Sequence, residues 1–200
     1  MSHCLNALWK QASRLVFLLL LPAPLCAVAS QADYHIEPDA SQAVFRVRLF
    51  WLDYVSGLFT HVDGDVAPGP HPDSWVVNAT IPVDSVTMSS SRMRQWLLAP
   101  SFFDAERHPT IHFVSNPVAL TELDHGGTLT GYLTLRGVTA PIHFAVEPEH
   151  CTEEHDVTTP CRIVLRGNLH RSTYGMTSDR LAISDSVDLN LSITLQRETR

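Results

Sequence analysis

A hydrophobic repeat with a period of two constrains this chain more than any other feature. It is clearest near the C-terminus, where Val187, Leu189, Leu191, Ile193 and Leu195 alternate with polar residues. Successive side chains of a β-strand point to opposite faces. The segment is therefore predicted to be a strand with one dry face and one face in water.

The same alternation recurs along most of the chain, and turn signals rich in Pro, Gly and Asp, such as 67–70 and 124–127, separate the runs. No strand–helix–strand rhythm is visible, so a doubly wound fold is disfavoured. Roughly eight short strands predict one continuous all-β, antiparallel domain, either a sandwich or a barrel. The other predicted strands cover 43–49, 55–66, 75–81, 111–113, 129–136, 142–147 and 163–170.

One short helix interrupts the strands. Serines 89–91 offer N-cap hydroxyls, and residues 92–98 are good helix formers that end before Pro100. The helix and the segment after it carry a dense apolar group, which either plugs one end of the barrel or gates a ligand cavity. Its members are Trp96, Leu97, Phe102 and Phe103.

The first 29 residues have the layout of a secretory signal peptide. Lys10 and Arg14 precede the apolar run Leu15–Leu21, and small residues lead to a predicted cleavage after Ala29, with Ala32 as an alternative. The run is too short to span a bilayer. We therefore expect an exported, periplasmic protein whose domain covers residues 30–200.

Loss of this leader leaves 12 basic and 21 acidic residues, a net charge of −9. So acidic a chain is a poor match for nucleic acid, which is bound through clustered Lys and Arg. It also argues against electrostatic attraction of the whole protein to anionic membranes.

Two of the four cysteines, Cys4 and Cys26, leave with the leader. The remaining pair, Cys151 and Cys161, would face an oxidising compartment, which favours a disulfide across a short loop. The alternative is a zinc site that combines these two cysteines with His150 and His155.

Several motifs together resemble the YceI-like family of periplasmic polyisoprenoid-binding proteins, from about Tyr34 to Leu195. The resemblance implies a lipocalin-like, eight-stranded barrel. Two positions depart from the family pattern, because Leu49 stands where a histidine is usual and Met93 where an acid is usual. The motifs, in the family's order, are 45–48, 57–59, 63–64, 83–86, 102–104, 108–111, 131–141, 171–176 and 183–187.

The resemblance and the apolar faces together imply non-catalytic carriage of a long isoprenoid, a polyprenyl phosphate or a quinone, in the barrel interior. Arg92 and Arg171 are candidates for a head-group contact, or else for a barrel-end ion pair or backbone clamp. For each lining residue, ordinary core packing is the competing explanation. The proposed lining is Phe45, Val47, Phe59, Phe113, Leu133, Phe144, Leu189 and Leu191, and the proposed mouth is Arg92, Trp96, Leu97, Phe102, Phe103, Arg171, Tyr174 and Met176.

The alternative hypothesis to lipid carriage is an enzyme or a protein-interaction module on the same barrel. No Gly-x-Ser-x-Gly or His-Glu-x-x-His motif occurs. His108 and His112 lie in a strand-like segment with Pro109 between them, so no shared helical face is expected to hold a metal. We expect no cofactor other than the lipid ligand. The identity of the lipid, transient membrane contact and the oligomeric state, a dimer included, stay open.

Overall fold

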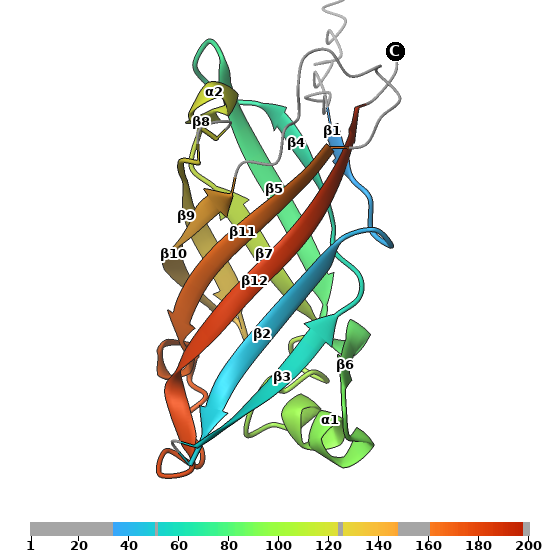
Figure 1. Ribbon diagram of the computed structural model, residues 1–200, viewed down its shortest axis with the longest axis vertical. Coiled ribbons are helices and arrows are strands. Elements are labelled where there is room, and N and C mark those ends of the chain that lie inside the picture. Colours follow the sequence, from blue (N-terminus) through green and yellow to red (C-terminus); the bar gives the residue numbers. More distant parts are fainter. Residues whose placement is uncertain (1–33, 51, 124–125, 148–160, 198–200) are drawn as a thin grey trace, which may run out of the picture.

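The computed structural model describes residues 34–50, 52–123, 126–147 and 161–197. More than half of them belong to one antiparallel sheet, and short helical segments lie between its strands (Figure 1). The predicted leader and the 148–160 loop lie outside the described residues. The strands are β1 (Tyr34–Ile36), β2 (Gln42–Leu49), β3 (Asp53–Phe59), β4 (Asp63–Pro68), β5 (Ser74–Pro82), β6 (Val86–Met88), β7 (Thr110–Ser115), β8 (Val118–Ala119), β9 (Thr128–Leu135), β10 (Val138–Glu147), β11 (Cys161–His170) and β12 (Ile183–Arg197).

The sheet closes on itself. β12 pairs with β11 along one edge, and along the other it pairs with β2 and, near its end, with β1. The pairs β1 and β2, β3 and β4, and β5 and β6 each form one bent pass of the chain, because both members pair with the same neighbouring pass. The predicted antiparallel eight-stranded barrel is thus confirmed.

The strand predicted over 55–66 is wrong in one respect, since it is divided into β3 and β4. Between them, the amide of Thr60 donates to the carbonyl of Ser85 and that of Val62 to the carbonyl of Pro38, both at 3.4 Å. These bonds draw the chain out of the regular ladder. Side-chain alternation predicts faces but carries no signal for such a bend.

The helical segments lie at the two ends of the barrel (Figure 1). At the lower end, Ser90 caps α1 (Ser91–Leu98) by accepting a hydrogen bond from the amide of Met93. The predicted helix is therefore present, one residue longer than expected. The other segments are η1 (Val83–Ser85), η2 (Arg171–Tyr174) and, at the upper end, the single turn α2 (Leu120–Leu123).

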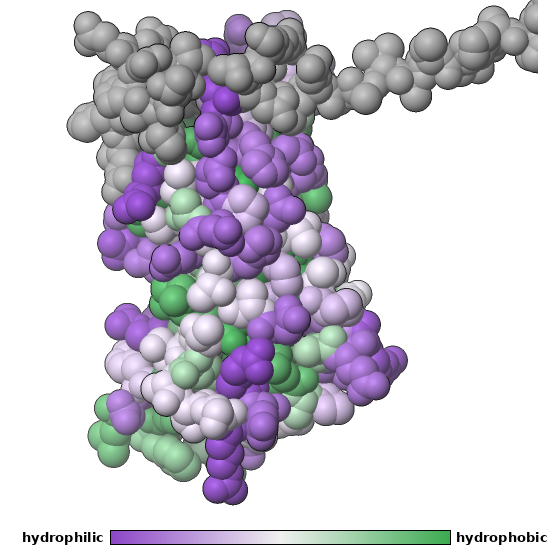
Figure 2. Space-filling model, turned by 90° about the vertical axis from the view of Figure 1, so that its right-hand side faces the viewer, coloured by the Kyte–Doolittle hydropathy of each residue, from purple (hydrophilic) through white to green (hydrophobic). Residues whose placement is uncertain are grey.

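In the barrel, residues at alternate positions of a strand point to the interior and to the outer surface. In β10, Ala140, Ile142, Phe144 and Val146 are buried, and the residues between them are exposed. The outer wall is mostly hydrophilic, and apolar residues protrude at the lower end (Figure 2). No helix in the described part of the chain is long and apolar enough to cross a membrane.

Candidate functional site

An apolar cavity of about 220 Å³ lies inside the barrel. Side chains from strands all around the barrel and from α1 form its wall, and Arg171 is the one charged residue among them. A cavity of this kind excludes polar ligands, because they would lose their hydration without a replacement. The structure places all eight predicted lining residues in this wall: Phe45, Val47, Phe59, Phe113, Leu133, Phe144, Leu189 and Leu191.

Pairs of phenylalanine and glycine keep the bore open. Phe45 faces Gly57 across β2 and β3, and a Cβ atom on that glycine would overlap the Phe45 ring. Phe144 faces Gly167 in the same way, where a Cβ would lie 2.6 Å from the ring. Each ring therefore lies flat against the barrel wall, over a residue without a side chain. Rings held this way take up less of the lumen than rings that stand into it.

Gly131 serves a related purpose. A Cβ there would lie 2.8 Å from the Phe113 ring and 2.4–2.7 Å from the backbone of Val114 and Ser115 in β7. Strands β7 and β9 therefore approach closely at this point, and no larger residue fits without a shift. Phe113 in turn packs edge-on against Phe144, with ring centroids 5.5 Å apart. The space beside Gly131 is thus filled by a neighbouring strand and ring.

The segment after α1 closes the lower end of the bore. Phe103 reaches in between Phe45 and Phe59, with ring centroids at 6.4 and 5.8 Å and T-shaped geometry. Its amide donates to the carbonyl of Leu97 at 3.0 Å, which ties the segment to the helix. Phe102 is also buried and packs against Trp96, whose indole stays 43% exposed. These four predicted mouth residues do come together at the cavity.

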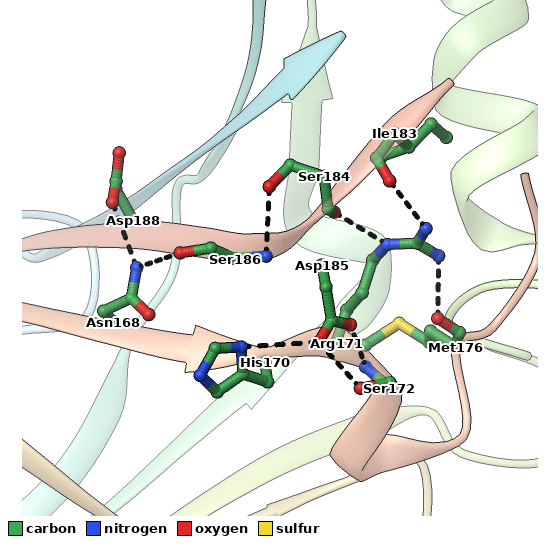
Figure 3. Close-up of polar contacts among 10 residues, drawn as sticks. All are labelled: Asn168, His170, Arg171, Ser172, Met176, Ile183, Ser184, Asp185, Ser186 and Asp188. Carbon is green, nitrogen blue, oxygen red and sulfur yellow. Dashed lines mark hydrogen bonds and ion pairs between the residues drawn. The ribbon is translucent and has the colours of Figure 1, made fainter. Parts of the chain in front are cut away.

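Arg171 has a different environment from the other predicted mouth residues (Figure 3). It is 4% exposed, and its guanidinium donates to the backbone carbonyls of Met176, Ser178, Ile183 and Ser184 at 2.7–2.9 Å. Desolvation by burial lowers the pKa of Arg171, an effect opposed by the nearby carboxylate of Asp185. Four of its five N–H donors are thus occupied by backbone carbonyls. This is the backbone clamp predicted from the sequence as an alternative to a head-group contact.

Of the remaining mouth candidates, only Met176 lines the cavity. Arg92 is exposed on α1 and is not in the cavity wall, whereas Arg94 donates to the carbonyls of Val86 and Asp84. Tyr174 is buried in η2 outside the wall, and burial raises the pKa of its hydroxyl. Met176 is buried and does line the cavity.

A polar cluster beside Arg171 contains a serine, a histidine and an aspartate (Figure 3). Asp185 accepts from the hydroxyl and the amide of Ser172, both at 2.9 Å, and lies 3.3 Å from Nδ1 of His170. Burial raises the pKa of Asp185, but the hydrogen bonds from Ser172 and the electrostatic attraction of His170 and Arg171 together hold that pKa below its ordinary value. Ser172 donates to the carboxylate and not to the imidazole, so its hydroxyl lacks the serine–histidine contact that activates a serine nucleophile.

No group of three or more His, Cys, Asp or Glu side chains converges on a metal position within the described ranges. His112 contacts the hydroxyls of Thr80 and Thr110 at 3.1 and 2.8 Å. The alternative zinc set and the predicted disulfide both include residues outside the described ranges, so each stays a prediction.

Sequence reasoning missed several parts of the wall. Leu49 and Met93, which were not among the predicted lining residues, both line the cavity. The roles of Gly57 and Gly167 were also missed. A glycine among alternating residues was the only signal for them, and it does not say which ring lies opposite.

Comparison with known proteins agrees with this architecture. The family model for the YceI-like domain matches residues 34–195. A UPF0312 protein of Ectopseudomonas mendocina is 28% identical over 184 residues, which are 90% of this chain and 95% of that protein. A UPF0312 protein of Pectobacterium atrosepticum is 30% identical over 117 residues, and the match spans 57% of this chain and only 60% of that protein. The solved polyisoprenoid binding domain from Saccharophagus degradans superposes with a TM-score of 0.64 at 15% identity, covering 84% of this chain and all of that domain.

Proposed function

The chain belongs to the YceI-like family, and from this membership and the apolar bore we propose that it binds and carries an isoprenoid lipid inside the barrel. The observation that carries the proposal is the wall of the cavity, in which Arg171 alone is charged and has most of its donors occupied by backbone. The solved relative described as a polyisoprenoid binding domain shares this fold and supports the same ligand class.

The energetics favour a hydrocarbon tail. Each buried carbon contributes about 0.8 kcal/mol, so one five-carbon isoprene unit contributes roughly 4 kcal/mol before the costs of binding. The cavity of about 220 Å³ is smaller than the usual range of roughly 300–1,000 Å³ for ligand pockets. A long tail therefore has to thread as a single slender chain and move half-buried mouth side chains such as Met93 and Leu97 aside.

In this proposal the protein is a carrier, not a catalyst, and acts after export to the periplasm. The polar cluster of Ser172, His170 and Asp185 supports the carrier reading, because its serine is hydrogen-bonded to the carboxylate. No cofactor other than the bound lipid is proposed.

Lipid carriage is tested on protein expressed with its own N-terminal segment and purified without denaturation. Organic extraction and mass spectrometry should find a polyprenyl phosphate or an isoprenoid quinone in near-stoichiometric amount. Repeated preparations without lipid that also fail to take up an added polyprenyl phosphate would contradict the proposal. Recovery of a hydrolysed product would favour the enzyme instead.

A matched pair of variants shows whether the lipid lies in the bore. Leu191→Gln places an amide in the cavity wall, and an unpaired buried amide costs roughly 1–3 kcal/mol, so bound lipid should fall about tenfold. Asn190→Gln places the same glutamine side chain on the exposed face of the same strand and should leave the lipid content unchanged. Equal lipid content in the two variants would place the lipid elsewhere.

We also propose that Cys151 and Cys161 form a disulfide in the exported protein. The closed loop is short, so the bond should stabilise the fold by roughly 3 kcal/mol in the chain-entropy description. Titration of processed, denatured and unreduced protein should detect no free thiol, because the other two cysteines are expected to leave with the leader. Two reactive thiols would refute the pairing.

A further inference from the structure

Three large apolar side chains protrude into solvent at the lower end of the barrel. Phe50 and Leu52 lie in the turn between β2 and β3, and Leu181 lies in the turn before β12. Their exposed fractions are 65%, 91% and 93%, well above the 52% or less of every other exposed large apolar residue in the described ranges. We refer to these three residues as the apolar tip. Figure 2 shows apolar residues protruding at this end.

The two turns of the tip form one built unit. The amide of Phe50 donates to the carbonyl of Ala182 at 2.7 Å, although the two residues are far apart in the chain. Phe50 has a φ of 46°, a left-handed conformation that is uncommon for a bulky residue. Leu181 is held at its turn by bonds from the amides of Ala182 and Ile183 to the carbonyl of Asp179. The backbone therefore fixes these apolar side chains in an outward position.

The tip is continuous with the cavity. Leu49 and Ile183 pair across β2 and β12, and both line the bore. Phe50 directly follows Leu49, and Ala182 directly precedes Ile183. The Phe50–Ala182 hydrogen bond therefore lies next to this pair of lining residues. Helix α1 lies at the same end (Figure 1), and its exposed Trp96 packs against Phe102, one of the side chains that close the bore.

Cationic side chains flank the tip. Arg48 and Arg180 line a surface hollow of about 370 Å³, together with Leu181, the imidazole of His170 and the carboxylate of Asp185. Arg48 donates to the hydroxyl of Tyr54 at 2.7 Å, and the Arg46 guanidinium lies 4.6 Å from the centre of the same ring.

Charge is also unevenly distributed along the barrel. The segments at this end, 48–54, 83–108, 136–137 and 170–185, carry seven arginines and six carboxylates, whereas the other described segments carry four arginines and eight carboxylates. The net negative charge that disfavours attraction of the whole protein to an anionic membrane is thus concentrated away from the tip.

We propose that this end of the barrel docks on an anionic phospholipid bilayer, with Phe50, Leu52 and Leu181 inserted among the lipids and Arg48 and Arg180 at the level of the phosphates. Burial of protruding apolar side chains together with cationic contacts is how proteins bind at a bilayer surface. Three side chains on two turns are far fewer than the roughly 20–30 residues per side of a stable protein interface, so a second copy of the chain fits the tip less well. Docking rests on the proposed carriage for its purpose, because it brings the mouth of the bore to the lipid.

Vesicle co-sedimentation tests the proposal. The protein is expressed from its full-length sequence, and the N-terminus of the purified product is verified by mass spectrometry. The tip variant is Phe50→Asn, Leu52→Ser and Leu181→Ser, with asparagine at residue 50 because it tolerates a left-handed backbone. The control variant is Val114→Ser with Tyr132→Ser, an exposed cross-strand pair on the outer wall of β7 and β9. All three proteins share the same N-terminal segment, so its contribution cancels.

Wild type and the control variant should bind vesicles of phosphatidylglycerol and phosphatidylcholine, and bind phosphatidylcholine vesicles more weakly. The affinity of the tip variant for the anionic vesicles should be at least about tenfold lower than that of wild type. Equal binding by the tip variant, or no binding by wild type, would overturn the proposal. A wild-type dimer in sedimentation velocity that the tip substitutions dissociate would also overturn it, in favour of a second copy.

The same preparations separate docking from carriage. After incubation with an excess of a polyprenyl phosphate, lipid extraction should find as much bound lipid in the tip variant as in wild type, because none of the three tip residues lines the bore. Lost vesicle binding with retained lipid supports docking at the tip. Vesicle binding by wild type with an empty bore would leave docking in place and refute carriage.

Discussion

Gly57→Ala is expected to lower the amount of lipid bound in the barrel about tenfold. The new methyl group overlaps the Phe45 ring, so the ring has to leave the wall and move toward the lumen, where Phe59 and Phe103 already pack against it. Overpacking of this kind costs roughly 1–3 kcal/mol, and 1.4 kcal/mol corresponds to about a tenfold change in affinity. Titration with a polyprenyl phosphate, followed by intrinsic fluorescence or extraction, measures the change.

A double variant tests the physical reason. Phe45→Leu removes the ring atoms that the new methyl group would meet, so Gly57→Ala combined with Phe45→Leu should recover most of the lost affinity. Ser56→Ala on the exposed face of β3 is the matched control and should bind as wild type does. If Gly57→Ala kept full affinity, or if the double variant bound no better than the single one, the wall-pair explanation of the open bore would be wrong.

Arg171→Met is expected to lower the free energy of unfolding by about 4 kcal/mol. The substitution leaves the carbonyls of Met176, Ser178, Ile183 and Ser184 without their common donor inside a tightly folded end segment. Loss of one partner from a buried charged network typically costs roughly 3–5 kcal/mol. Equilibrium unfolding in urea measures the loss.

The matched control is an exposed arginine of β11, the strand that ends directly before Arg171. Arg162 is exposed on β11, and Arg162→Met should change the free energy of unfolding by no more than about 0.5 kcal/mol. Arg171→Lys keeps the charge but not the fork of donors, and should fall between wild type and Arg171→Met. An Arg171→Met variant with wild-type stability but reduced lipid binding would instead indicate a head-group contact.

Much of the barrel could be predicted from the chain. The alternation over 142–147 predicted which side chains of that part of β10 are buried, and the serines before α1 predicted where the helix begins. The apolar group of Trp96, Leu97, Phe102 and Phe103 was also predicted to lie together, because helical spacing and direct succession bring these residues close whatever the rest of the chain does.

Other features depend on residues that are distant in the chain. A period of two determines which face a side chain occupies, but not which residue lies opposite it, because the register of a strand is set by its turns and by closure of the barrel. The placement of Gly57 against Phe45, and the Phe50–Ala182 bond that joins two turns into the tip, are therefore products of register and closure. The clamp of Arg171 likewise exists only once the 176–184 backbone has turned its carbonyls inward. The sequence by itself determined the strands and their dry faces, and the tertiary structure decided that those faces enclose an open bore with one apolar end.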